Sequence, residues 1–253
     1  MTGTATPRRA APATARIIAQ GRFEAGNLLR NGEQLVVSVI LPAMALVGLT
    51  LMPFPDLGSH ARIDVAAPGA LALAVASTAF TGQAIGTGFD RRYGVLRLLG
   101  TTPLGRSGLL LGKAISVGVI LATQVLVLGG LALAMGWRPS PAGILPALLG
   151  LVLGSLAFVM LALLLAGTLR PEAVLALANL LWVLFLGLGL MLPTNRLPAA
   201  LGPVAAYLPS GALGDGLRAA LLDGAWPWTQ FLVLLAWAVV AGLLARRFFR
   251  FSE

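Results

Sequence analysis

The chain has 253 residues, of which 58% are hydrophobic and 11% are charged, and its mean hydropathy is +0.90. A soluble domain is about 25% charged, so this composition excludes an ordinary soluble enzyme and indicates a protein that crosses a membrane several times. The net charge of +9 follows membrane topology rather than nucleic-acid binding, and the absence of cysteine excludes disulfides and thiol chemistry.

The first thirty residues fall into two parts. Residues 1–12 are mostly Ala, Thr, Pro and Arg, a composition that predicts disorder. Residues 13–31 place apolar side chains on one face of a helix and polar ones on the other, which is typical of an amphipathic interfacial helix. Phe23 falls on the polar face, so it is either an isolated surface aromatic or a contact for a soluble partner.

Six apolar runs follow, each close to the roughly 20 residues that a helix needs to cross a bilayer. We therefore predict an all-α membrane protein with one transmembrane domain, whose six transmembrane helices lie within residues 34–245. Pro68 is expected to be the first residue of the second span, because proline suits a helix start. The predicted spans cover residues 34–52, 68–88, 109–136, 142–169, 173–192 and 229–245.

Residues 193–228 do not form a span of their own. They contain several prolines between moderately apolar pieces, and Ser210 is expected to cap a short helix that ends at Leu222 and is closed by Gly224. Such a helix is too short to cross the bilayer and too charged to lie in hydrocarbon. We predict a re-entrant or interfacial helical hairpin on the outer side, before the last span.

Basic residues are distributed unevenly among the loops. If the N-terminus is inside, most of the 18 basic residues fall in inner segments. Cytoplasmic loops retain Lys and Arg, so the distribution predicts a multi-pass protein of the plasma (inner) membrane with both termini in the cytoplasm. The inner loop from Phe89 to Lys113 is the most charged, which suggests that a soluble partner binds there. Its charged residues are Asp90, Arg91, Arg92, Arg97, Arg106 and Lys113.

Several kinds of chemistry are missing. The spans have no acid near their middle, which disfavours a carrier driven by protons or sodium. The segment Gly108–Lys113 is one residue too short for a phosphate-binding loop, and Ala114 stands where Ser or Thr is needed. His60 beside Asp56 and Asp64 is interpreted as a solvated loop residue rather than a metal ligand. We predict a non-catalytic chain with no metal site and no cofactor of its own.

Uncharged polar residues within the spans are candidates for a substrate route. Gln83, Gln124 and Asn179 are the most informative, because an amide costs more to bury than a hydroxyl. Such residues either form hydrogen bonds between helices or line the path of a substrate. The candidate substrate-path residues are Gln83, Asn179 and Ser38.

The charged loop also carries a motif. In order, it contains Asp90-Arg91-Arg92, Gly94-Val95-Leu96, Leu98-Leu99, Thr102-Pro103-Leu104, Arg106 and Leu111-Gly112-Lys113. This order resembles the cytoplasmic loop of permease subunits of the second-type, or type V, ATP-binding-cassette (ABC) exporters. The resemblance covers the whole chain, including the Arg30-Asn31-Gly32 turn and Leu208-Pro209-Ser210-Gly211 before the last span. Asp90 departs from the pattern, because these loops often have Glu there.

The resemblance implies a permease domain that pairs with a second permease copy or a paralogue. Each permease would dock on an ABC ATPase subunit, which binds ATP and magnesium, and the first, second and fifth spans would line the substrate path. The N-terminal helix and the charged loop would contact the ATPase. The expected coupling contacts are Phe23, Glu24, Asp90, Tyr93, Leu96, Arg97 and Pro103.

The expected substrate is apolar or amphiphilic, such as a drug, an antibiotic or a lipid. The spans are nearly uncharged, and Tyr and Trp are sparse, whereas routes for sugar polymers are rich in aromatic residues. Three alternatives stay open: a haem-type exporter subunit, an ATP-independent carrier or channel, and a membrane scaffold. Membrane lipids are expected partners and nucleic acid is not.

Overall fold

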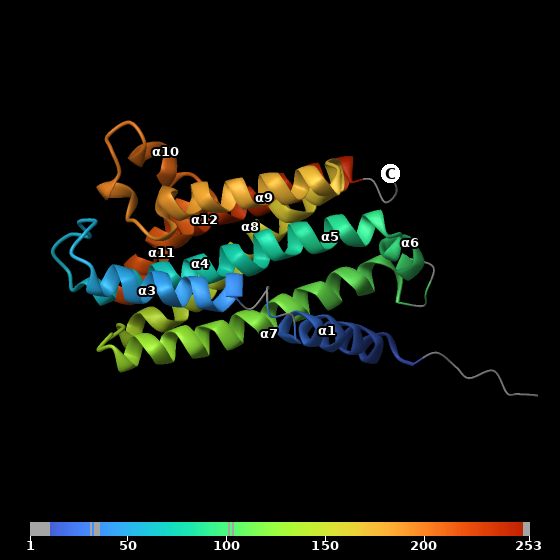
Figure 1. The fold of residues 1–253 in the computed structure, drawn as a ribbon, viewed down its shortest axis with the longest axis horizontal. Helices are drawn as coiled ribbons and strands as arrows, with labels where there is room; N and C mark the ends of the chain where they lie inside the picture. The colour runs from blue at the N-terminus through green and yellow to red at the C-terminus, as the bar shows by residue number, and fades with distance from the viewer. Residues whose placement is uncertain (1–10, 31, 33–35, 101, 103, 250–253) are drawn as a thin grey trace, which may run out of the picture.

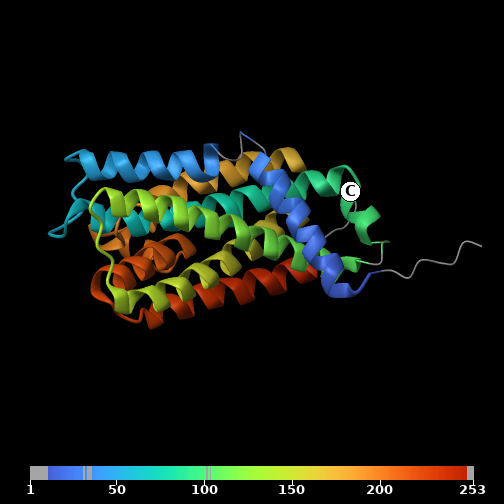
Figure 2. The ribbon, with the colours of Figure 1, turned by 90° about the horizontal axis from the view of Figure 1, so that it is seen from below.

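The computed structural model describes residues 11–30, 32, 36–100, 102 and 104–249. Within these residues the chain is helical and has no strand, as predicted. The helices run along one long axis as an elongated bundle, and the helix nearest the N-terminus, α1 (Ala13–Arg30), crosses one end of the bundle obliquely (Figures 1 and 2).

Five helices in the described part of the chain are long and apolar enough to cross a membrane. The predicted class, an all-α membrane protein, is thereby confirmed. These helices follow one another in the same order as the predicted apolar runs. They are Arg62–Arg92, Leu111–Ala134, Pro141–Thr168, Pro171–Leu190 and Trp228–Phe248.

Of the first predicted span, residues 34–52, the structure describes residues 36–52, and these are helical as far as Leu51. The π-helical segment η1 (Val36–Ile40) leads into α3 (Leu41–Leu51), and α3 packs along α4 (Arg62–Val75). The apolar stretch Ser38–Leu51 is shorter than the five candidate spans. A sixth crossing therefore stays a prediction.

Pro68 does not begin a helix. The helix α4 begins at Arg62, so Pro68 lies inside it and the prediction of a helix start was wrong. Proline removes one backbone hydrogen bond, a loss that a helix tolerates when neighbouring helices surround it, and Pro68 is buried. The preceding loop is correspondingly shorter than predicted.

A single central helix, Arg62–Arg92, forms the core of the bundle. It comprises α4, the π-helical η2 (Ala76–Gly82) and α5 (Gln83–Arg92), and most of its residues are buried by neighbouring helices. Its many alanines allow those helices to approach closely. Phe80 lies in the middle of this helix, with ring centroids 6.1 Å from Phe158 and 5.6 Å from Phe185.

The remaining long helices surround the central one. They are α7 (Gly105–Ala134), α8 (Ile144–Thr168), α9 (Pro171–Phe185) and α12 (Trp228–Phe248), and α8 packs extensively on α12. Their outward faces carry large apolar side chains that are exposed in the isolated chain. Such faces suit contact with lipid or with another membrane helix. Examples are Leu126, Val152, Val183 and Leu243.

The predicted outer hairpin packs as part of the bundle. Its main helix, α11 (Pro209–Asp223), is almost entirely buried and contacts α4, α8 and α12. The prediction of a short helix that ends before Gly224 is confirmed, since Gly224 closes it with φ +66°. Ser210 is not its cap, because the helix starts one residue earlier at Pro209.

Candidate coupling surface and outer polar clamp

One end of the bundle, called here the basic end, holds most of the charged residues that the sequence singled out. It is formed by α1, the corner between α5 and α6 (Val95–Gly100), the turn between α8 and α9, and the end of α12 (Figure 1). Gly94, with φ +71°, makes the corner that separates α5 from α6. Glycine suits this position because it adopts a positive φ without strain.

The helix α1 packs on another helix of the chain. It lies against α7, where Gly21 of α1 meets Gly112 of α7. A Cβ atom at Gly21 would lie 2.7 Å from Ile115 Cγ2, and one at Gly112 would lie 2.7 Å from Gln20 Cγ. The two helices therefore contact each other through their glycines. Gly21 and Ala25, on the apolar face predicted to lie on the membrane, are both buried.

A group of four side chains links α1, α5 and α7. Lys113 Nζ on α7 donates a hydrogen bond to Asp90 Oδ2 on α5 at 3.0 Å, and it lies 3.7 Å from Glu24 Oε2 on α1. Gln20 Nε2 donates to Glu24 Oε1 at 2.8 Å. Glu24 and Asp90, both expected to contact an ATPase, thus interact within the chain.

The two arginines that follow Asp90 bind the opposite side of the bundle. Arg91 Nη2 donates to the backbone oxygen of Leu169, which closes α8. Arg92 Nη1 forms an ion pair with Glu172 in the first turn of α9. The Asp90–Arg92 segment therefore joins the α5–α6 corner both to α1 and α7 and to the α8–α9 turn.

Large side chains next to these charges are exposed. Phe23 on α1 is 64% exposed, and Tyr93 at the corner is 72% exposed. The Tyr93 ring stacks on Phe89 with centroids 6.2 Å apart, and Leu98 on α6 is also exposed. The basic end thus exposes apolar and aromatic side chains next to charged residues that form ion pairs within the chain.

The other expected coupling residues differ in their placement. Leu96 is only 5% exposed, so its side chain is packed inside the chain rather than offered to a partner. Pro103 lies outside the described residues, and so does the side chain of Arg97. Among the expected contacts, Phe23 and Tyr93 are the ones that the structure places on the surface.

The predicted substrate-path residues do not share one environment. Ser38 and Gln83 are buried, whereas Asn179 on α9 is exposed in the isolated chain. Gln124 Nε2 donates to the backbone oxygen of Ser38 at 2.6 Å and to Thr78 Oγ1 at 2.8 Å. Gln124 therefore forms hydrogen bonds between helices, Ser38 takes part through its backbone oxygen, and Asn179 lies on an outward face.

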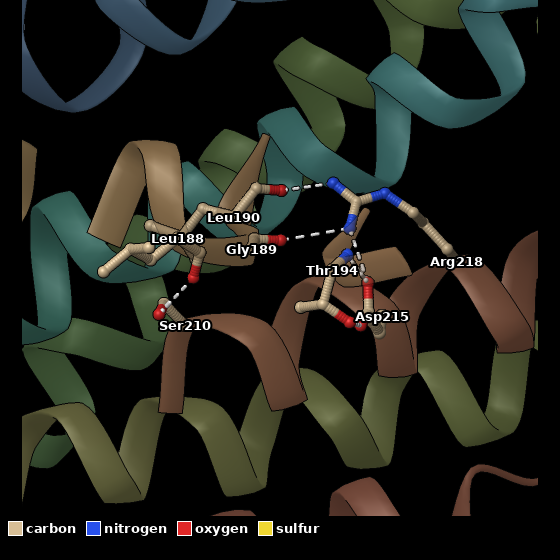
Figure 3. Close-up of polar contacts among 7 residues, drawn as sticks. All are labelled: Leu188, Gly189, Leu190, Thr194, Ser210, Asp215 and Arg218. Carbon is tan, nitrogen blue, oxygen red and sulfur yellow. Dashed lines mark hydrogen bonds and ion pairs between the residues drawn. The ribbon is translucent and has the colours of Figure 1, made fainter. Parts of the chain in front are cut away.

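At the other end of the bundle lies a polar cluster that the sequence did not predict. The helix α9 continues into η4 (Leu186–Leu190), where Leu188 and Gly189 leave helical geometry. Ser210 Oγ donates to the oxygen of Leu188 at 2.6 Å (Figure 3). Arg218 Nη1 donates to the oxygen of Gly189 at 3.0 Å, and its Nη2 donates to the oxygen of Leu190 at 2.5 Å. We call this cluster, with Thr194 and Asp215, the outer clamp, after the predicted outer hairpin that contains Ser210, Asp215 and Arg218.

Asp215 completes the outer clamp. Its Oδ1 accepts from Arg218 Nη1 at 3.1 Å and from the Thr194 amide at 3.2 Å, and its Oδ2 accepts from the Thr194 hydroxyl (Figure 3). Burial lowers the pKa of Arg218 to about 10, and the attraction of Asp215 opposes this shift. The Arg218 side chain therefore stays charged at neutral pH and binds carbonyl groups that the broken helix leaves without partners.

Close backbone contact explains the glycines around the outer clamp. Gly189 has φ +105°, and a Cβ there would lie 2.3 Å from Gly211 Cα. A Cβ at Gly214 would lie 2.0 Å from the oxygen of Gly189. Only glycine at these positions lets α11 lie directly against the break in α9. The glycines are visible in the sequence and suggest close packing, but the sequence does not show which segment they pack against.

The fold defines a polytopic helical membrane protein, and charged and exposed aromatic side chains gather at one end of it. Residues 63–247 match the model of the ABC-2 family transporter protein, so the chain belongs to this family. It is the membrane component of an ABC transporter, a component that works with an ABC ATPase on a partner chain. A search of the curated proteins finds no significant match.

Proposed function

We propose that this chain is the transmembrane subunit of an exporter that moves an apolar or amphiphilic substrate out of the cytoplasm. Its energy would come from ATP hydrolysed by a separate subunit docked at the basic end. The observation that carries the proposal is the pairing of exposed Phe23 and Tyr93 with neighbouring charges that are held within the chain. Exposed aromatic side chains on a fixed backbone are typical of a protein–protein contact.

The distribution of charges supports a cytoplasmic position for the basic end. Arg246 and Arg247 lie in the last turn of α12, and Arg92 lies in the last turn of α5. At the opposite end, Trp226 and Trp228 stack with centroids 5.3 Å apart, as aromatic residues do at a membrane interface. Both termini would then be cytoplasmic.

The outward face of α9 supports a route between two permease copies. Asn179 is exposed between apolar neighbours, of which Leu175 is 40% and Val183 is 58% exposed. A lone amide facing lipid is unfavourable, whereas an amide facing a second membrane helix or a substrate finds hydrogen-bond partners. The surrounding apolar surface suits an apolar or amphiphilic molecule such as a drug, an antibiotic or a lipid.

Co-purification of the ATPase tests the docking proposal. The chain is co-expressed with a candidate ABC ATPase, and the amount of ATPase retained is measured for the purified complex in lipid nanodiscs. We expect Phe23→Ala with Tyr93→Ala to lower ATPase co-purification about tenfold, because a few central aromatic residues supply most of the binding energy at an interface. Leu232→Ala, on the exposed face of α12, is the matched control. Full retention of the ATPase by the double variant would contradict the proposal, as would transport by the chain alone.

A further inference from the structure

Lys113 lies where three elements of the basic end meet. It is the only lysine in the chain, and it directly follows Gly112, the residue on which α1 crosses α7. Its side chain is 11% exposed, and its ammonium group interacts with Asp90 of α5 and Glu24 of α1. One cation on α7 thus faces one carboxylate from each of the two elements that the proposed function assigns to ATPase docking.

The positive charge of Lys113 balances the two carboxylates that lie beside it. The side chains of Glu24 and Asp90 are 15% and 34% exposed, and without a cation two carboxylates would face each other at a partly buried site. Like charges there repel, because partial burial reduces screening by water. Gln20 also orients Glu24, so the carboxylate faces the lysine. Removing the charge of Lys113 would weaken the link of α1 to α5 and to α7.

We propose that Lys113 is a positioning residue that joins α1 to the α5–α6 corner, so that the two elements move as one unit when the ATPase changes conformation. Lys113 is mostly covered by the helix crossing, with 11% of its side chain exposed, and would not touch the ATPase itself. The inference rests on the proposed function for its mechanical role. The link between the helices does not depend on the proposed function, because the ion pairs and the glycine contact support it.

The first experiment uses no ATPase. Hydrogen–deuterium exchange is measured on the purified chain in nanodiscs, for the wild type, Lys113→Met and Lys113→Arg. Methionine keeps the length of the side chain and removes its charge, while arginine keeps the charge. We expect Lys113→Met to speed exchange in residues 13–30 about tenfold, since hydrogen bonds to charged groups are lost. Lys113→Arg should exchange like the wild type, and α8 should be unaffected in all three proteins.

Two controls make this measurement decisive. Arg196→Met breaks the ion pair between Arg196 and Asp56 in the loops at the opposite end and should leave exchange in α1 unchanged. Asp90→Asn should speed exchange in α1, and adding it to Lys113→Met should bring exchange part of the way back to the wild type, because it removes the repulsion between Glu24 and Asp90. Unchanged exchange of α1 in Lys113→Met, or equal acceleration in every helix, would overturn the proposal.

The second experiment adds the ATPase. In the complex, Lys113→Met should retain the bound ATPase but lower its stimulated hydrolysis of Mg-ATP about tenfold, and Lys113→Arg should restore it. Full stimulation with Lys113→Met would overturn the coupling role. If the wild-type chain stimulates no ATPase, the proposed function fails, while the exchange measurement still decides whether Lys113 joins the two helices.

Discussion

Arg218 lies where α9 loses its helical geometry, and its guanidinium group accounts for the stability of that break. Three carbonyl groups, those of Leu188, Gly189 and Leu190, accept hydrogen bonds from Ser210 or Arg218. A guanidinium group has several donors in a fixed plane, so it can bind two adjacent carbonyl groups and a carboxylate at once. A lysine ammonium cannot reproduce this geometry.

The outer clamp leads to a prediction for stability. Arg218→Met should lower the free energy of unfolding by about 2 kcal/mol, because buried carbonyl groups lose a charged donor. The measurement is the denaturation midpoint of the purified chain in detergent. Arg138→Met, at an exposed position in the loop before α8, should change stability by less than about 0.5 kcal/mol. Equal midpoints for the two variants would show that the outer clamp does not stabilise the chain.

Charged residues were easier to find in the sequence than to interpret. The run Asp90-Arg91-Arg92 was correctly identified as unusual, yet all three residues have partners inside the chain. Their partners, Lys113, Leu169 and Glu172, are far away in sequence, and helix packing alone brings them close. Sequence periodicity identifies the helices, but it does not say which helices become neighbours. The sequence therefore cannot distinguish a charged residue that binds a partner protein from one that forms an ion pair within the chain.

At the scale of elements, the order of the apolar runs could be predicted, but the local helix geometry within them could not. Hydropathy identified the five candidate spans, because any helix in lipid must be apolar over about 20 residues. It did not reveal the π-helical segments η1, η2 and η4, or the break at Gly189. These depend on which side chains pack against each helix. The start of α4 was misjudged for the same reason.

The contact between α1 and α7 gives a prediction at this scale. Gly21→Val should displace α1, because even a Cβ at Gly21 would lie 2.7 Å from Ile115. Trypsin should then cleave after Arg16 and Arg22 about tenfold faster, since cleavage follows local opening.

Gly26 supplies the matched control for the displacement of α1. A Cβ there meets nothing within 4 Å, so Gly26→Val should be cleaved like the wild type. Equal cleavage of the Gly21 and Gly26 variants would mean that the glycine contact does not hold α1 on α7.

At the scale of the whole molecule, the exposed face of α9 predicts how two copies meet. Because the chain has no cysteine, a single introduced cysteine can report on this contact. Asn179→Cys should form a disulfide-linked dimer on mild oxidation in the membrane, whereas Val152→Cys on the exposed face of α8 should stay monomeric. Non-reducing electrophoresis gives the answer. A dimer through Val152→Cys alone would move the interface to α8.

The central claim is that the basic end docks the ATPase. The most direct test places a photoreactive amino acid at Tyr93, which is 72% exposed, and separately at Trp226, which is 43% exposed at the opposite end. Both proteins are irradiated in membranes, and cross-linked products are identified by mass spectrometry. The account predicts an adduct between position 93 and an ABC ATPase, and none at position 226. An ATPase adduct at position 226 alone, or at neither position in an active complex, would contradict it.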